Sequence, residues 1–215
     1  MIRMLIADDH AVVRSGLKQM LSGHADLVVV GEAVDGLEVL KKLRELPCDL
    51  LLTDMAMPGR SGIELLKMVK DEHPKLAILV LSMHKEEQYA VRALKAGARG
   101  YLTKESAPDQ LVTAIRKVAA GGMFISPGVA ERLALELHGN HEAEPHTLLS
   151  DREFQIFRLI VSGESLGSIA AELSLSVKTV STHKARILQK MQMTSSAELI
   201  HYAIRHHLLE LPDSA

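Results

Sequence analysis

The sequence of 215 residues has a single cysteine and little aromatic character: it contains no tryptophan, three tyrosines and three phenylalanines. The lone cysteine, Cys48, cannot form an internal disulfide, which excludes the disulfide-stabilised folds that small secreted domains use. Because Cys48 lies just before a predicted strand, we expect it to lie in or near a core rather than to act as a nucleophile.

Long hydrophobic runs and a strong charge of one sign are also missing. No apolar stretch approaches the ~20 residues that a membrane-spanning helix needs. The first residues are apolar only as far as Asp8, which is too short for a secretory signal peptide, and the formal net charge is −2. These absences predict a cytoplasmic protein that does not bind membranes, with one large domain or two modest ones.

The first half of the chain alternates short apolar runs with segments of helical periodicity. The runs typical of strands occupy residues 2–7, 27–30, 50–53, 76–81 and 99–102. The helical segments that follow them begin near residue 11, at Asp35, at Ser61, before Val91 and at Ser106, which we expect to cap its helix. This alternation predicts an α/β fold with a doubly wound, five-stranded parallel sheet covered on both faces.

Polar side chains stand where these strands end. Asp8 and Asp9 follow the first strand, Asp54 the third and Ser82 the fourth, while Lys104 comes just after the fifth. The carboxyl ends of parallel strands meet at one edge of the sheet, where ligands bind. The sequence therefore predicts one pocket with three carboxylates, a hydroxyl and an ammonium group.

Such a pocket suits phosphoryl chemistry. Clustered carboxylates repel one another unless a cation is present, and Mg²⁺ prefers carboxylate oxygens and water. Lys104 and Ser82 can contact phosphoryl oxygens, and the carboxylate of Asp54 can attack phosphorus. Each residue alone could be a helix cap, a turn residue or a solvated charge. Their joint placement indicates a Mg²⁺ site in which Asp54 accepts a phosphoryl group.

Residues 1–125 resemble the receiver domain of bacterial response regulators. The shared residues are Asp8-Asp9, Asp54-x-x-Met57-Pro58-x-x-x-Gly62, Ser82, Tyr101 and Lys104. The resemblance implies a flavodoxin-like strand order of 2-1-3-4-5 and a sensor histidine kinase as the phosphoryl donor.

The same resemblance implies a role for each pocket residue. Asp54 would be the phosphoacceptor, and Asp8, Asp9, Asp54 and the backbone carbonyl of Ala56 would surround the Mg²⁺. Ser82 and Tyr101 would form a switch pair, the hydroxyl moving to the phosphate and the ring following inward. Many receivers have proline after the lysine, whereas this sequence has Glu105.

Residues 126–148 change character and are expected to link two domains. A short helix is expected over residues 129–137, and residues 139–146 are polar and lack periodicity, which is typical of a flexible linker. The linker carries four glutamates against one arginine. We interpret it as a solvated tether; the alternative is an acidic segment that competes with DNA for a basic surface.

Residues 149–215 have helical periodicity throughout, which predicts a small all-α domain. Ser150 and Glu153 form a capping-box pattern at its start. Further helices are expected over residues 166–173, 177–191 and 195–207. Two helices joined by a tight turn, the second long and cationic, are typical of a helix-turn-helix.

The segment 177–191 contains no acidic residue, although residues 149–215 as a whole are balanced in charge. We expect one face to pack on the core, formed by Val177, Val180, Ile187, Leu188 and Met191. Positive charge focused on one helix fits contact with DNA phosphates. An ordinary solvated helix face is the alternative reading.

Residues 149–209 resemble the LuxR-type helix-turn-helix domain of NarL/FixJ response regulators. The shared residues are Leu149, Ser150, Arg152, Glu153, Ile169, Ala170, Leu173, Leu175, Ser176, Lys178, Thr179, Val180, His183, Ile187 and Lys190. The resemblance implies that residues 177–191 enter the major groove, with Ser181, Thr182 and Ala185 facing bases, and that the last helix helps to dimerise the protein. The expected phosphate contacts are Lys178, Thr179, Lys184, Arg186 and Lys190. Gly167 and Ser168 replace a commoner Lys-Glu pair, which removes one possible phosphate contact.

The sequence thus predicts a transcription regulator rather than an enzyme. A histidine kinase would phosphorylate Asp54, and the resulting homodimer would bind paired half-sites in promoter DNA. One alternative is a phosphatase that uses Asp54 as nucleophile, although Ala56 stands where a second acid would be needed. The other is a DNA-binding or interaction protein with a constitutive receiver. The eleven histidines show no zinc-type spacing.

Overall fold

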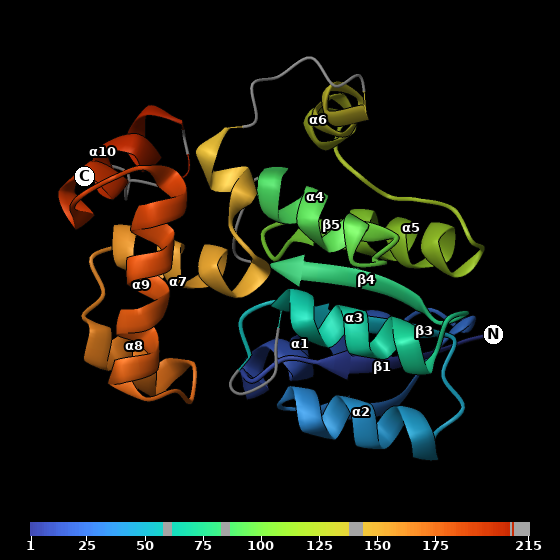
Figure 1. The fold of residues 1–215 in the computed structure, drawn as a ribbon. Coiled ribbons are helices and arrows are strands. Elements are labelled where there is room, and N and C mark those ends of the chain that lie inside the picture. Colours follow the sequence, from blue (N-terminus) through green and yellow to red (C-terminus); the bar gives the residue numbers. More distant parts are fainter. Residues whose placement is uncertain (58–61, 83–86, 138–143, 207, 209–215) are drawn as a thin grey trace, which may run out of the picture. The chain divides into compact units, whose positions relative to one another are not determined.

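The computed structural model describes residues 1–57, 62–82, 87–137, 144–206 and 208 (Figure 1). Pro58 of the receiver motif and the expected helix start at Ser61 lie outside these ranges. The chain divides into two compact units, Met1–His138 and Gly139–Ala215. In the described part of the chain, no helix has both the length and the apolar character needed to cross a membrane.

The first unit is an α/β domain. Its elements are β1 (Ile2–Ala7), α1 (Ala11–Leu21), β2 (Leu27–Ala33), α2 (Gly36–Glu45), β3 (Leu50–Asp54), α3 (Gly62–Glu72), β4 (Ala77–Ser82), α4 (Glu87–Lys95), β5 (Gly100–Thr103), α5 (Pro108–Ala119) and α6 (Pro127–Leu137). All neighbouring strands pair in parallel, in the order β2-β1-β3-β4-β5. This confirms the predicted flavodoxin-like sheet.

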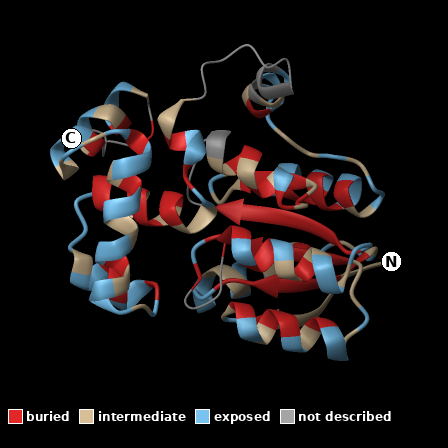
Figure 2. Ribbon diagram, in the orientation of Figure 1, coloured by how far each residue is buried: buried red, intermediate tan, exposed pale blue. Residues whose placement is uncertain are grey.

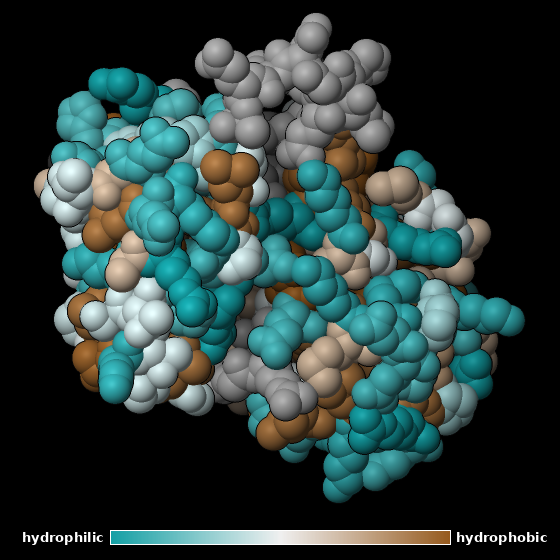
Figure 3. All heavy atoms as spheres, viewed as in Figure 1, coloured by the Kyte–Doolittle hydropathy of each residue, from teal (hydrophilic) through white to brown (hydrophobic). Residues whose placement is uncertain are grey.

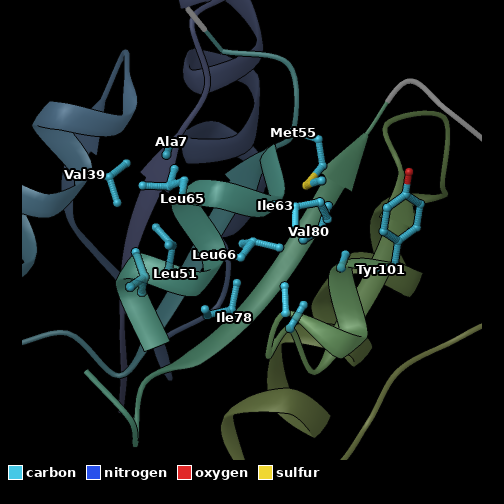
Figure 4. Packing of buried hydrophobic residues seen from close by; sticks show 14 of the residues in the cluster. Ala7, Val39, Leu51, Met55, Ile63, Leu65, Leu66, Ile78, Val80 and Tyr101 are labelled. Atoms are coloured by element: carbon cyan, nitrogen blue, oxygen red, sulfur yellow. The ribbon is translucent and has the colours of Figure 1, made fainter. Parts of the chain in front are cut away.

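Side chains of the central strands alternate between two hydrophobic cores. In β3, Leu50 and Leu52 face the core formed with α1 and α5, whereas Leu51 faces the core formed with α2, α3 and α4. Figure 2 shows the central strands buried and the helices buried along one side, and Figure 4 shows Ile63 and Leu66 of α3 over Ile78 and Val80. A sheet covered on both faces needs continuous apolar strands, which explains the runs in the sequence.

Local signals in the first unit are mostly confirmed. The side chain of Asp35 caps α2 by accepting a hydrogen bond from the N–H of Glu38. Cys48 is half-buried, and burial raises the pKa of its thiol. Ser106 does not cap α5: Ala107 is the cap residue, because Pro108 presets the first helical residue, and the Ser106 hydroxyl lies 3.1 Å from that of Thr103 instead.

The helix α6 belongs to the first unit and not to a free tether. Val129 is 4% exposed and lies in the same core as the side chains of α4. Leu133 packs against that core as well. The helix expected over residues 129–137 is therefore present, but the segment that connects the two units begins only after it.

The second unit consists of helices. They are the 3₁₀ helix η1 (Pro145–Leu148), α7 (Asp151–Val161), α8 (Leu166–Glu172), α9 (Val177–Met191) and α10 (Ser196–Arg205). Ser150 and Glu153 form the predicted capping box at α7, and Ser176 caps α9. The viewed faces of both units are mainly hydrophilic (Figure 3).

Two expectations for the second unit are wrong. The flexible linker was expected to reach residue 146, but His146 is fully buried in η1, where its Nδ1 lies 2.7 Å from the hydroxyl of Tyr202 in α10. Val177 was expected in the core, but it is 52% exposed. Val177 is the first residue of α9, and the side chains of that helix become buried only from Val180 onward.

Candidate functional site

The predicted pocket residues lie at the carboxyl edge of the sheet. Asp8 follows β1, Asp54 ends β3, Ser82 ends β4, and Lys104 follows β5. Asp8, Asp54 and Ser82 are buried, with exposed fractions of 2%, 3% and 0%. The sheet topology therefore places these residues at one edge of the sheet, as the sequence predicted.

Lys104 connects two of the carboxylates. Its Nζ lies 2.7 Å from Oδ2 of Asp8 and 2.7 Å from Oδ2 of Asp54, and its backbone N–H donates to the carbonyl of Ser82. Burial lowers the pKa of Lys104, but the hydrogen bonds to Asp54 and Asp8 outweigh that effect and raise it. The lysine is therefore a fixed positive charge in the pocket.

The two carboxylate oxygens of Asp54 differ in their contacts, because Lys104 contacts only Oδ2. Oδ1 is buried and has no hydrogen-bond partner in the structure. A buried carboxylate oxygen without a partner is costly, because it has lost water and gained no donor. Such an oxygen is placed to bind a cation or to form a bond to an electrophile.

Asp9 lies on the exposed side of the pocket together with a residue that the sequence interpretation missed. The Nδ1 of His10 is 2.8 Å from Oδ1 of Asp9 and 3.3 Å from Oδ1 of Asp8. One ligand atom each from Asp8, Asp9, His10 and Asp54 can be chosen so that all lie within 4.8 Å of one another. This oxygen-rich set fits a hard divalent cation such as Mg²⁺. Ala56 is exposed just after β3.

The two expected switch residues are on neighbouring strands. Tyr101 of β5 pairs with Val80 of β4, which lies two residues before Ser82 in the same strand. Tyr101 is 7% exposed and is part of the core beneath α4 (Figure 4). The ring is thus already buried in this structure.

The second candidate site is the outer face of α9. Lys178, Ser181, Thr182, Ala185 and Arg186 are exposed, and Thr179 and Lys184 are half-buried. Figure 2 shows this exposed face along the helix. The hydroxyl of Thr182 donates to the carbonyl of Lys178 within the helix, at 3.0 Å. Five of the expected DNA-contacting residues therefore lie on an open helical face.

Lys190 is placed differently from the other cations of α9. Its Nζ lies 2.6 Å from Oε2 of Glu153 and 3.3 Å from the carbonyl of Leu148. The structure therefore uses this ammonium inside the domain, where the sequence interpretation expected a phosphate contact. No local signal reveals the pair, because Glu153 is 37 residues away along the chain.

Comparisons with known proteins match both units. Residues 4–116 match the family model of the response regulator receiver domain, and residues 147–203 match that of bacterial regulatory proteins of the luxR family. The chain is 41% identical over 211 residues to the response regulator GacA of Pseudomonas viridiflava, covering 98% of this chain and 99% of GacA. It is 37% identical to the oxygen regulatory protein NreC of Staphylococcus carnosus, covering 97% and 100%.

Solved structures of the response regulator RcsB share the fold. One from Salmonella typhimurium has a TM-score of 0.71 at 29% identity and covers 95% of this chain and 97% of RcsB. Another, bound to a promoter in the presence of a phosphomimetic, has a TM-score of 0.68 at 29% identity and covers 94% and 97%. With the parallel sheet, the acidic pocket and the helix-turn-helix, these matches show that the chain belongs to the NarL/FixJ family of two-component response regulators, which control transcription.

Proposed function

We propose that Oδ1 of Asp54 is the atom that accepts the phosphoryl group. The observation that carries this assignment is the asymmetry of the carboxylate: Lys104 holds Oδ2, while the buried Oδ1 has no hydrogen-bond partner. In transfer from the phosphohistidine of a sensor kinase, the N–P bond breaks as an O–P bond to Oδ1 forms. The electron pair stays on the donor imidazole, which then takes a proton from solvent.

The carboxylates of Asp8, Asp9 and Asp54, with the backbone carbonyl of Ala56, would hold Mg²⁺. The bound cation supplies positive charge that offsets the charge on the phosphoryl oxygens. Lys104 contributes a second positive charge from the buried side of the pocket. Asp54 serves here as a regulatory acceptor and not as the nucleophile of a turnover enzyme.

Phosphorylation would then act on the surface formed by β4, β5 and α4. The hydroxyl of Ser82 would bind the phosphoryl group, and Tyr101 would hold the inward position that it has in this structure. This change would favour a homodimer. The solved structure of RcsB bound to a promoter in the presence of a phosphomimetic supports this proposal.

The outer face of α9 would enter the major groove of double-stranded DNA, one copy for each half-site. Ser181, Thr182 and Ala185 would face base edges. Lys178, Thr179, Lys184 and Arg186 would contact phosphates. Lys190, which the sequence also assigned to a phosphate, is proposed here as a supporting residue because of its bond to Glu153.

The test is phosphorylation of the full chain with acetyl phosphate and Mg²⁺, followed by intact mass spectrometry. Asp54→Asn should abolish the added phosphoryl group, and Asp71→Asn, which changes an exposed carboxylate on α3, should retain it. Ultracentrifugation and DNA titration with and without beryllofluoride then measure assembly and affinity. Labelling of Asp54→Asn would refute the acceptor assignment, and equal DNA affinity in both states would refute the coupling.

A further inference from the structure

The turn between α8 and α9 has an unfavourable backbone conformation. α8 ends at Glu172, and residues 173–176 connect it to α9, with Leu173 as the C-cap of α8 and Ser176 as the N-cap of α9. Ser174 has a φ of +52°, in the left-handed region. A residue with a Cβ rarely adopts this region, and glycine is the usual residue there at the end of a helix. The turn that sets the direction of α9 therefore includes a residue that does not favour its own conformation.

Backbone hydrogen bonds close part of this turn. The N–H of Leu175 donates to the carbonyl of Ala170 at 2.8 Å. The N–H of Ser174 donates to the carbonyl of Ala171 at 3.3 Å. These two bonds form a Schellman motif, which places a left-handed residue at Ser174. Leu173 is buried, and its carbonyl takes part in neither bond, so it needs a donor from another segment.

Arg152 supplies that donor from α7. Its Nη2 donates to the carbonyl of Leu173 at 3.0 Å, and its Nη1 donates to Oε1 of Gln155 at 2.8 Å. Gln155 lies one turn further along α7, so the guanidinium is held on its own helix while it reaches the turn. Hydrogen bonds from charged donors are stronger than those from neutral ones. The contact joins residues 21 positions apart and ties α7 to the turn before α9.

We propose that Arg152 is a positioning residue for DNA binding, because it holds Leu173 and Ser174 in the turn that directs α9 into the major groove. The inference rests on the role of α9 proposed above and adds a residue that does not contact DNA. A domain whose turn relaxes at Ser174 would present α9 at another angle and would bind DNA only after the turn had formed again. The apparent affinity then falls in proportion to the fraction of molecules with the competent turn.

The test separates positioning from direct contact through the salt dependence of DNA affinity. The full chain with Mg²⁺ and beryllofluoride is titrated against a duplex that the wild-type protein selects from a random-sequence library. Arg152→Ala should weaken binding by about tenfold, the factor that loss of a hydrogen bond from a charged group corresponds to. Its salt slope should remain that of wild type. Lys178→Ala, which removes an exposed cation of α9, should lower the slope by about one unit.

Ser174→Gly tests whether the turn is the point at which Arg152 acts. Glycine adopts the left-handed conformation without a Cβ clash, so the turn needs Arg152 less. Ser174→Gly should restore most of the affinity that Arg152→Ala loses and none of that lost in Lys178→Ala. Circular dichroism checks that each variant stays helical. If Arg152→Ala does not, Arg152→Lys takes its place, because an ammonium group lacks the planar fork that reaches both acceptors.

The outcomes separate this inference from the proposed function. If Lys178→Ala weakens binding but Arg152→Ala does not, the positioning role is wrong while the DNA-binding face of α9 stands. The positioning role is also wrong if Arg152→Ala lowers the salt slope as Lys178→Ala does, or if Ser174→Gly restores both variants equally or neither. If Lys178→Ala binds DNA with the affinity and slope of wild type, the proposed face of α9 fails, and this inference fails with it.

Discussion

The Nζ of Lys190 lies 2.6 Å from Oε2 of Glu153, a residue that is only 4% exposed. The pair joins α9 to the first turn of α7, where Glu153 also completes the capping box with Ser150. Burial raises the pKa of Glu153, but the hydrogen bonds from Lys190 and from the N–H of Ser150 outweigh it and lower the pKa. Lys190 thus stabilises the helix-turn-helix itself.

Replacing Lys190 by alanine should destabilise the second unit. The buried carboxylate of Glu153 would lose its charged donor, although the bond from Ser150 remains. Because the Lys190 side chain is 41% exposed, we expect a loss of about 1–2 kcal/mol in the free energy of unfolding. Urea denaturation followed by circular dichroism measures it.

Arg186→Ala is the matched control on the same helix. Arg186 is exposed, so its removal should leave the free energy of unfolding unchanged. It should instead weaken DNA binding for all sequences and reduce the salt dependence by about one unit of slope. If Lys190→Ala keeps full stability and changes the slope as Arg186→Ala does, then Lys190 is a phosphate contact after all.

A bidentate ion pair at the opposite edge of the sheet predicts loss of stability in acid. Hydrogen bonds from the side chain and then the backbone of Arg3 lower the pKa of Asp49 from 3.8 to about 2. A carboxylate whose folded pKa is depressed stabilises the fold above its unfolded pKa. This contribution should therefore be complete above about pH 4 and lost as the pH falls toward about 2.

The measurement is the free energy of unfolding of the first unit as a function of pH. Asp49→Asn should reduce the slope in the acid range, because the proton uptake of this group is removed. Asp71→Asn, at an exposed position on α3, should keep the slope. Identical slopes in wild type and Asp49→Asn would show that the Arg3 pair does not depress the pKa of Asp49.

Replacing Val129 tests whether the packing of α6 stabilises the receiver. Val129→Ala in the full chain should lower the stability of the first unit by about 2 kcal/mol, because two methylene equivalents are lost from a packed core. Glu131→Ala, at an exposed position of the same helix, should change stability little. Equal stability of both variants would support the tether that the sequence suggested for residues 126–148.

The fold and the acidic pocket could be predicted from the sequence because both depend on simple repeated features. Strands buried on both faces must be apolar throughout, and parallel strands place Asp8, Asp54, Ser82 and Lys104 at one edge. The identity of the residues at the strand ends then determines the chemistry of the pocket.

Features that depend on contacts between distant segments were not predictable in this way. The pattern of residues 129–137 predicts a helix but not the core beneath α4 that buries Val129. A helical projection places Lys190 beside the other cations but does not reveal Glu153. No pattern in the sequence singles out His10, and only the structure shows its ring against Asp9.

The final prediction concerns Lys104, because its ammonium group competes with a cation for the same carboxylates. It contacts Asp8 and Asp54 at 2.7 Å each. Lys104→Ala should raise Mg²⁺ affinity by at least about fivefold, since a unit charge near 4 Å contributes about 1 kcal/mol or more even at high dielectric constant. It should also weaken the dimerisation induced by beryllofluoride, because the phosphoryl mimic loses a positive partner.

Competition between Mg²⁺ and Mn²⁺, followed by electron paramagnetic resonance, measures the affinity. Lys75→Ala, an exposed lysine before β4 at the other edge of the sheet, is the control and should leave the affinity unchanged. A lower Mg²⁺ affinity in Lys104→Ala would mean that the ammonium group holds Asp8 and Asp54 in position for the cation. In that case the mutual repulsion of the carboxylates, and not competition with Lys104, would limit binding.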